Sequence, residues 1–221
     1  MDFSFLLDVF LHLDTHLGAF MQQYGTPVYV VLFLIIFCET GLVVTPFLPG
    51  DSLIFAAGAL AATGIVSWAA LPLFIVAAVT GNMLNYQIGR FLSERVKQRK
   101  QMRFIKQENL DRTQAFFDKH GGITIVITRF MPILRTFSPF VAGVGKMPYK
   151  RFLFFNTVGG ISWASAFFLI GYFFGNLPEV QSHFSVIVIA IVIVSVIPAV
   201  IAFVKGKMAD KEKKSGYEGN S

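Results

Sequence analysis

Four charged residues lie inside strongly apolar segments of this sequence. They are Glu39, Asp51, Arg129 and Arg135. At the centre of a lone transmembrane helix one charge costs about 2.5–3.5 kcal/mol, so four cost roughly 10–14 kcal/mol, comparable with the whole stability of a small domain. We therefore expect these residues to face a cavity or to pair with each other. Both acids belong to the first half of the chain and both arginines to the second.

The two arginines suit the binding of a phosphate. A guanidinium group is planar, presents paired N–H donors that match phosphate oxygens, and stays charged when it is desolvated. Breaks in the neighbouring helices also leave helix N-termini with free N–H groups, which are a second anion-binding element. The sequence therefore predicts that Arg129 and Arg135 bind the substrate.

The two acids cannot bind an anion, but Glu39 and Asp51 can take up protons. A low dielectric favours the neutral acid, whereas a nearby arginine favours the carboxylate. Protonating an acid would release its arginine to bind the anion, which gives a proton-coupled exchange. A structural interpretation competes with this one, namely two salt bridges that lock two segments together. It is the weaker of the two, because desolvation offsets most of the attraction within a buried pair.

Proline and glycine interrupt the apolar segments that carry these charges. The predicted breaks are Pro46, Pro49, Gly50, Pro132 and Pro139. Such residues end or break a helix. The arm 53–64 reaches only about 18 Å, whereas the hydrocarbon core of a bilayer is about 30 Å thick. We therefore expect two re-entrant helical hairpins, each of which enters the bilayer and returns to the same side.

A longer apolar segment follows each hairpin and is able to span a bilayer. These segments are 68–92 and 152–175, and 184–204 is expected to be a final span. The first of them carries Asn82, Asn85 and Gln87, and its residues Gly81, Asn85 and Gly89, spaced by four, form a small or polar stripe that suits close helix packing. The halves 26–92 and 121–176 thus share one order of parts.

Short matches support this internal repeat. Ala56-Ala57-Gly58 parallels Val141-Ala142-Gly143, and Ile88-Gly89-Arg90-Phe91 parallels Ile170-Gly171-Tyr172-Phe173. Paired, interrupted apolar segments at matching positions indicate a transport site near the middle of the membrane.

Composition and charge agree with an integral membrane protein. The chain is 54% hydrophobic and 14% charged, whereas soluble domains have about 45–50% apolar and about 25% charged residues. The linker 93–120 carries eight Lys or Arg against four acids, and further lysines follow the last span. Cytoplasmic segments are rich in Lys and Arg. The first hairpin is therefore expected to open outward and the second inward, so that the repeat is inverted and the C-terminus cytoplasmic.

The rest of the chain is expected to form one membrane domain over 1–205, with a disordered basic tail at 206–221. Phe3 to Met21 has a polar face and predicts an amphipathic helix near the interface. Residues 1–25 contain no Lys or Arg, which disfavours a signal peptide. Gly171 and Gly175 form a G-x-x-x-G motif that packs either within the chain, as we favour, or in a homodimer.

Several classes of function are disfavoured. The net charge of +6 sits in blocks between apolar runs, without the motifs of nucleic-acid-binding modules. The single cysteine, Cys38, allows no disulfide within the chain. The histidines lie at segment edges and no metal-ligand spacing occurs, so neither a metal, another cofactor nor an enzymatic reaction is expected.

At these residues the sequence resembles the bacterial DedA family, whose VTT domain is shared with eukaryotic lipid scramblases, and its namesake branch most of all. The resemblance covers about residues 3 to 205. It is carried by Phe37-Cys38-Glu39-Thr40-Gly41-Leu42, Pro46-Phe47-Leu48-Pro49-Gly50-Asp51-Ser52-Leu53, Lys119-His120-Gly121-Gly122, Arg129-Phe130-Met131-Pro132-Ile133-Leu134-Arg135-Thr136 and Pro139-Phe140-Val141-Ala142-Gly143.

This resemblance implies an inner-membrane protein with two facing re-entrant hairpins. It also implies functional roles for the acids at Glu39 and Asp51 and for the arginines at Arg129 and Arg135. Some family members are implicated in returning undecaprenyl phosphate across the membrane, and others in membrane homeostasis that depends on the proton gradient. The expected function is therefore a flippase for a phosphate-bearing lipid, with membrane lipids and protons as its partners.

Three alternatives remain at this point. A proton-coupled transporter of a small ion or drug would use the same charges. A lipid phosphatase would need a nucleophile with a neighbouring base. A scaffold would tolerate an exchange of Glu39 with Arg129, which a phosphate site would not.

Overall fold

The computed structural model describes residues 13–42, 50–98 and 121–175, together with residues 177, 180 and 186. All regular elements within these ranges are α-helices. They are α2 (Leu13–Tyr24), α3 (Pro27–Gly41), α4 (Gly50–Ala62), α5 (Ala70–Gln98), α7 (Ile123–Thr128), α8 (Pro132–Val144) and α9 (Tyr149–Phe174). The predicted all-α class is confirmed for this part of the chain. Pro46, Pro49 and the tail 206–221 lie outside the described residues, as do the final span 184–204 apart from residue 186 and most of the linker 93–120.

Two of these helices are long and apolar enough to cross a membrane. They are α9 and, within α5, the segment Ala70–Ser93. Unlike the core helix of a soluble protein, both turn large apolar side chains outward: Val76, Leu84, Ile88, Phe91, Phe154, Val158, Ile161, Ile170 and Phe173. An apolar surface of this extent suits lipid rather than water.

The predicted span 68–92 agrees with the apolar segment Ala70–Ser93, and the helix α5 itself continues to Gln98. The segment Ser93–Gln98 contains no glycine or proline, and Glu94, Arg95 and Lys97 are good helix formers. The helix therefore extends past its apolar part into the basic linker, since charge stops a membrane span but does not stop a helix.

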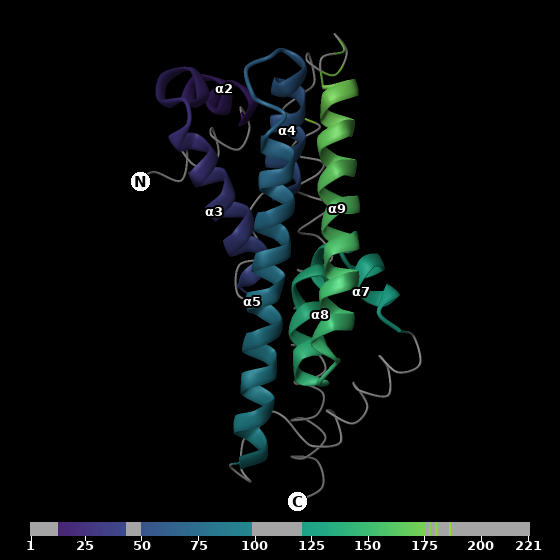
Figure 1. Ribbon diagram of the computed structural model, residues 1–221. Helices are drawn as coiled ribbons and strands as arrows, with labels where there is room; N and C mark the ends of the chain where they lie inside the picture. Colours follow the sequence, from purple (N-terminus) through teal and green to yellow (C-terminus); the bar gives the residue numbers. More distant parts are fainter. Residues whose placement is uncertain are drawn as a thin grey trace, which may run out of the picture.

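The four remaining helices of the two halves are too short to cross. α3 has 15 residues, α4 and α8 have 13 each, and α7 has 6. At about 1.5 Å per residue even the longest reaches only about 22 Å. In Figure 1, α3 and α4 lie beside the upper part of the two long helices, and α7 and α8 lie beside the lower part.

Each half places its second short helix against the long helix of the other half, so that α4 packs on α9 and α8 packs on α5. Glycine makes these crossings close. A Cβ atom at Gly58 of α4 would overlap the carbonyl oxygen of Phe168, and one at Gly143 of α8 would overlap that of Tyr86. The helix backbones are therefore in contact where α4 crosses α9 and where α8 crosses α5.

The reverse contacts follow the same pattern. A Cβ atom at Gly171 of α9 would overlap the carbonyl oxygen of Phe55, and one at Gly89 of α5 would overlap that of Phe140. Gly58 and Gly143, like Gly89 and Gly171, are positions at which the two halves of the sequence match. The matching residues thus make matching contacts.

The G-x-x-x-G motif packs within the chain. Gly171 lies against Phe55 and Gly175 lies against Ala59, both on α4. This agrees with the favoured interpretation of the motif, because α4 occupies the glycine face that a second copy would need.

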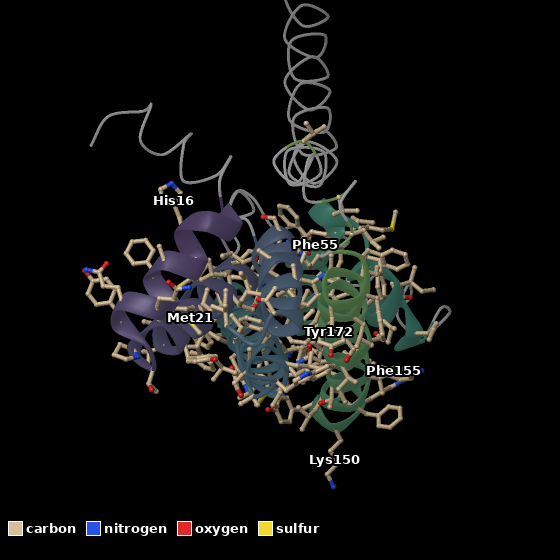
Figure 2. All side chains as sticks on the ribbon, turned by 90° about the horizontal axis from the view of Figure 1, so that it is seen from above. His16, Met21, Phe55, Lys150, Phe155 and Tyr172 are labelled. Atoms are coloured by element: carbon tan, nitrogen blue, oxygen red, sulfur yellow. The ribbon has the colours of Figure 1, made fainter. Side chains whose placement is uncertain are left out.

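The N-terminal helix α2 covers α4. Its buried residues Leu17 and Met21 join the main apolar core, and Gly18 lies close to Leu60. Figure 2 shows His16 at the outer edge of α2 and Lys150 of α9 projecting away from the helices. The described part of the predicted amphipathic helix therefore has one face packed against the bundle.

The prediction that Pro139 interrupts the helix is wrong, because α8 continues through this residue to Val144. The helix instead begins at Pro132, where a missing N–H is tolerated in the first turn. A proline inside a helix removes one backbone hydrogen bond and displaces the carbonyl groups of the preceding turn. The carbonyl that lacks its helical donor here is that of Arg135, and the carbonyl of the next residue, Thr136, accepts a hydrogen bond of 2.8 Å from the Asn85 side chain.

Replacing Gly143 by alanine is expected to destabilise the fold by about 1–3 kcal/mol, because the added methyl group overlaps the backbone of Tyr86. Gly58→Ala should have a similar effect through Phe168. The measurement is the midpoint of thermal unfolding of the purified protein in detergent. Gly18→Ala is the matched control, since its Cβ atom would meet Leu60 at an ordinary 3.6 Å. Unchanged midpoints in the first two variants would contradict the described packing.

Candidate functional site

The four charged residues meet inside the bundle, and we call them the charged cluster. Glu39 lies in the last turn of α3, Asp51 in the first turn of α4, Arg129 in the link between α7 and α8, and Arg135 in α8. Their exposed fractions are only 0%, 7%, 2% and 4%, respectively. The acids and arginines, which are some 80 residues or more apart in sequence, are thus brought together and removed from solvent.

Arg135 binds both acids. Its Nη2 donates to Oε1 of Glu39, and its Nη1 donates to Oδ1 of Asp51 at 2.5 Å. The expected pairing of acids from one half with arginine from the other therefore occurs, but through one arginine rather than two. A planar guanidinium with two separate terminal N–H groups is well suited to hold two carboxylates at once.

The start of α4 shapes the position of Glu39. A Cβ atom at Gly50 would overlap the Glu39 carboxylate, so only glycine lets this group lie against the first residue of the helix. Free N–H groups and the helix dipole favour negative charge at that end. Asp51 lies in the same turn, so the end of α4 supports both acids.

Trp163 of α9 links the charged residues. Its Nε1 donates to the same Asp51 Oδ1 that Arg135 binds, at 2.9 Å. Its ring lies 5.1 Å from Cζ of Arg135 and 5.9 Å from Cζ of Arg129, within the range of cation–π attraction. Sequence reasoning missed this residue, although a tryptophan within an apolar span needs a partner for its N–H.

Arg129 has different partners. Its Nη2 donates to Oδ1 of Asn156 at 2.7 Å and to the carbonyl of Ala78 at 3.3 Å. Its Nε and Nη1 are buried and have no hydrogen-bond partner among the described residues. Asn156 in turn donates to the carbonyl of Val79 at 3.0 Å, and the side-chain amide of Asn82 lies against both Oδ1 of Asn156 and Nη2 of Arg129. Neither Asn156 nor the contacts of Asn82 were predicted from the sequence.

Asn85 joins the two halves beside the charged cluster. Its side-chain nitrogen donates to the carbonyl of Thr40 at 3.2 Å and to that of Thr136 at 2.8 Å. These residues directly follow Glu39 and Arg135. One amide of α5 therefore holds the backbone next to both partners of an ion pair, which is more than the packing role that the stripe predicted.

The charged cluster combines acidic, cationic and amide groups. Within the described residues, no group of three or more His, Cys, Asp or Glu side chains is placed to hold a metal ion. Two acids, two guanidinium groups and several amides offer sites for protons and oxyanions. A change in any one charge must alter the hydrogen bonds of its neighbours, because all of them are shielded from solvent.

Comparison with known proteins identifies relatives over nearly the whole chain. The VTT domain matches residues 48–173. Protein DedA of Escherichia coli is 46% identical over 208 residues, which cover 93% of this chain and 95% of that protein. An uncharacterized membrane protein of Mycobacterium leprae is 43% identical over 170 residues, covering 76% of each.

Inner membrane protein YghB of Escherichia coli is 35% identical over 157 residues, which cover 71% of this chain and 72% of that protein. No solved structure matches the chain. The matched domain contains Asp51, Arg129 and Arg135 of the charged cluster. The match with protein DedA, which covers 93% of the chain, also includes Glu39. Together with the apolar spans α5 and α9, these matches show that the chain belongs to the DedA family of VTT-domain membrane proteins.

Proposed function

We propose that this protein is a transporter that moves a phosphate-bearing lipid, such as undecaprenyl phosphate, across a bacterial inner membrane. The observation that carries the proposal is the charged cluster, in which Arg135 holds Glu39 and Asp51 away from solvent. A buried ion pair adds little to stability, because desolvation offsets its attraction. Its presence among short, interrupted helices therefore favours a role in binding and exchange over a role in folding.

The architecture in the proposal is an inverted repeat. α3 and α4 form one re-entrant hairpin and α7 and α8 form the other, and they enter from opposite sides of the membrane. The matching contacts of Gly58 with Phe168 and of Gly143 with Tyr86 support this symmetry. The basic linker and the C-terminus are cytoplasmic in this arrangement, and substrate binds where the hairpins meet.

Protons drive the exchange in this mechanism. In the resting state Arg135 is neutralised by two carboxylates. Protonation of Glu39 or Asp51 removes one of the two ion pairs of Arg135 and leaves the charged cluster with a net positive charge, so that the released terminal N–H group of Arg135 can join Arg129 in binding a phosphate. Loss of the proton restores the ion pairs and expels the anion. The Trp163 hydrogen bond to Asp51 orients this carboxylate throughout the cycle.

The surroundings of the arginines favour a lipid over a small ion. Four large apolar side chains near Arg129 and Arg135 are 42–51% exposed: Phe130, Met131, Leu134 and Phe137. An amphipathic substrate would place its phosphate on the buried guanidinium groups and its apolar chain along this outer face. A small hydrated ion would gain no favourable contact from such an apolar surface.

The proposal includes no catalytic step, and its alternative is a proton-coupled transporter of a small ion or drug. Purified protein in liposomes should move a fluorescent prenyl phosphate between leaflets, without accelerating the flux of inorganic phosphate or of a cationic dye. Arg129→Gln and Arg135→Gln should each abolish the movement, because each removes a binding group. Solute flux without lipid movement would reject the lipid proposal in favour of the alternative.

The acids are tested separately by carboxamide replacement. Glu39→Gln and Asp51→Asn are expected to abolish the dependence of transport on a proton gradient, because an amide cannot take up or release the proton. The measurement is the lipid transport rate in liposomes with and without an imposed pH gradient. If both variants keep the gradient dependence of the unmodified protein, the proton-coupled mechanism is wrong.

A further inference from the structure

The two buried arginines are held in opposite ways. Arg135 is bound by the carboxylates of Glu39 and Asp51, so its positive charge is neutralised by the protein itself. Arg129 is bound by the side-chain amide of Asn156 and the backbone carbonyl of Ala78, both of which are uncharged. No carboxylate forms an ion pair with Arg129 in the described part of the chain.

This difference matters because a buried charge requires a counter-charge. Moving an ion from water into the protein interior is strongly unfavourable unless an opposite charge or several hydrogen bonds compensate it. An amide satisfies one N–H group and fixes the guanidinium in place, but it leaves the full positive charge. Arg129 also keeps two buried N–H groups, at Nε and Nη1, that have no hydrogen-bond partner among the residues that the structure describes.

We propose that Asn156, together with Asn82, positions Arg129 without neutralising it, so that the oxyanion of the substrate serves as its counter-ion. This inference rests on the proposed function and names the substrate class of the same site, which is an anionic phosphate rather than a zwitterion or a cation. The phosphate is received by Nε or by Nη1 of Arg129, which lie on different sides of the guanidinium. Asn156 is thus a positioning residue whose lack of charge determines which substrates bind.

Glycine and tryptophan complete this site. A Cβ atom at Gly159 would lie 3.4 Å from Nε, and one at Gly160 would lie 3.2 Å from Nη1, so side chains at these positions would crowd the two donors. The ring of Trp163 attracts the guanidinium from another direction. Nε and Nη1 are shielded from solvent, so the structure shows the site closed, and entry of the anion requires the surrounding helices to separate.

Asn156→Asp tests this proposal sharply, because it places a carboxylate of nearly the same shape at the atom that Arg129 already binds at 2.7 Å. The internal carboxylate then competes with the substrate. Affinity is measured by calorimetry on the full-length protein in detergent, with farnesyl phosphate as the probe. We expect Asn156→Asp to weaken binding by about tenfold or more, as for loss of a charge-assisted interaction.

Asn82→Asp offers a second route to the same result, since this side chain lies 3.0 Å from Asn156 Oδ1 and within reach of Arg129. It carries the test if Asn156→Asp fails to fold, which thermal unfolding will show. Lys150→Gln is the control for net charge. It changes the charge by the same amount at a residue that projects away from the helices, and should alter affinity by less than about threefold.

Asn156→Ser separates charge from shape. It shortens the side chain without adding charge, so it should lose less affinity than the isosteric Asn156→Asp. If the serine variant loses as much or more, Asn156 has only a structural role and the inference is wrong. Unchanged affinity in both aspartate variants also overturns it. Absence of binding by the unmodified protein would instead reject the proposed function itself.

Farnesol and inorganic phosphate identify the source of the anion. Binding of farnesyl phosphate, with no binding of farnesol and weaker binding of inorganic phosphate, supports a lipid headgroup as the occupant. Equal affinity for inorganic phosphate and farnesyl phosphate would overturn the lipid source, although loss of both in the aspartate variants would still support the role of Asn156. Tight binding of farnesol would overturn the proposal, because it would show that the apolar chain alone drives association.

Discussion

The ion pairs of Arg135 with Glu39 and Asp51 are the interaction on which the rest of the structure depends. They join the two halves of the chain at a depth where unpaired charge is intolerable. Their formation requires the short helices to approach the long helices of the opposite half at backbone distance. Glycine allows this approach at the crossings, and Gly50 allows the Glu39 carboxylate to lie against the start of α4. Loss of close packing would therefore separate the charges.

The two arginines of the charged cluster are held differently. Within the described residues, Arg135 is bound by two carboxylates and Arg129 by neutral partners. Trp163 contacts both guanidinium groups and donates to Asp51. A shift of one arginine therefore changes the contacts of the ring that the other arginine shares. A membrane protein built for stability alone would replace such groups by apolar residues, which pack in the bilayer without a desolvation cost.

The same arrangement explains why several helices are short and why their outer surfaces are apolar. A helix that begins inside the bundle brings its free terminal N–H groups into the protein interior, where they support an anion. Asp51 in the first turn of α4 makes use of this, as does Glu39 beside Gly50. Phe130 and Leu134 are exposed, whereas their sequence neighbours Arg129 and Arg135 are buried. An apolar outer surface therefore lies directly beside the buried charges.

Patterns within single segments determined much of this protein. Apolar length predicted α5 and α9, and the rarity of charge in lipid singled out Glu39, Asp51, Arg129 and Arg135 as residues that must meet. Tertiary structure alone decided that Arg135 takes both acids, and that Trp163 and Asn156 complete the charged cluster. It also decided that α8 continues through Pro139, where Asn85 of another helix takes up a carbonyl of the preceding turn. These choices depend on which side chains face each other across helices distant in sequence, and periodicity along one helix does not specify that.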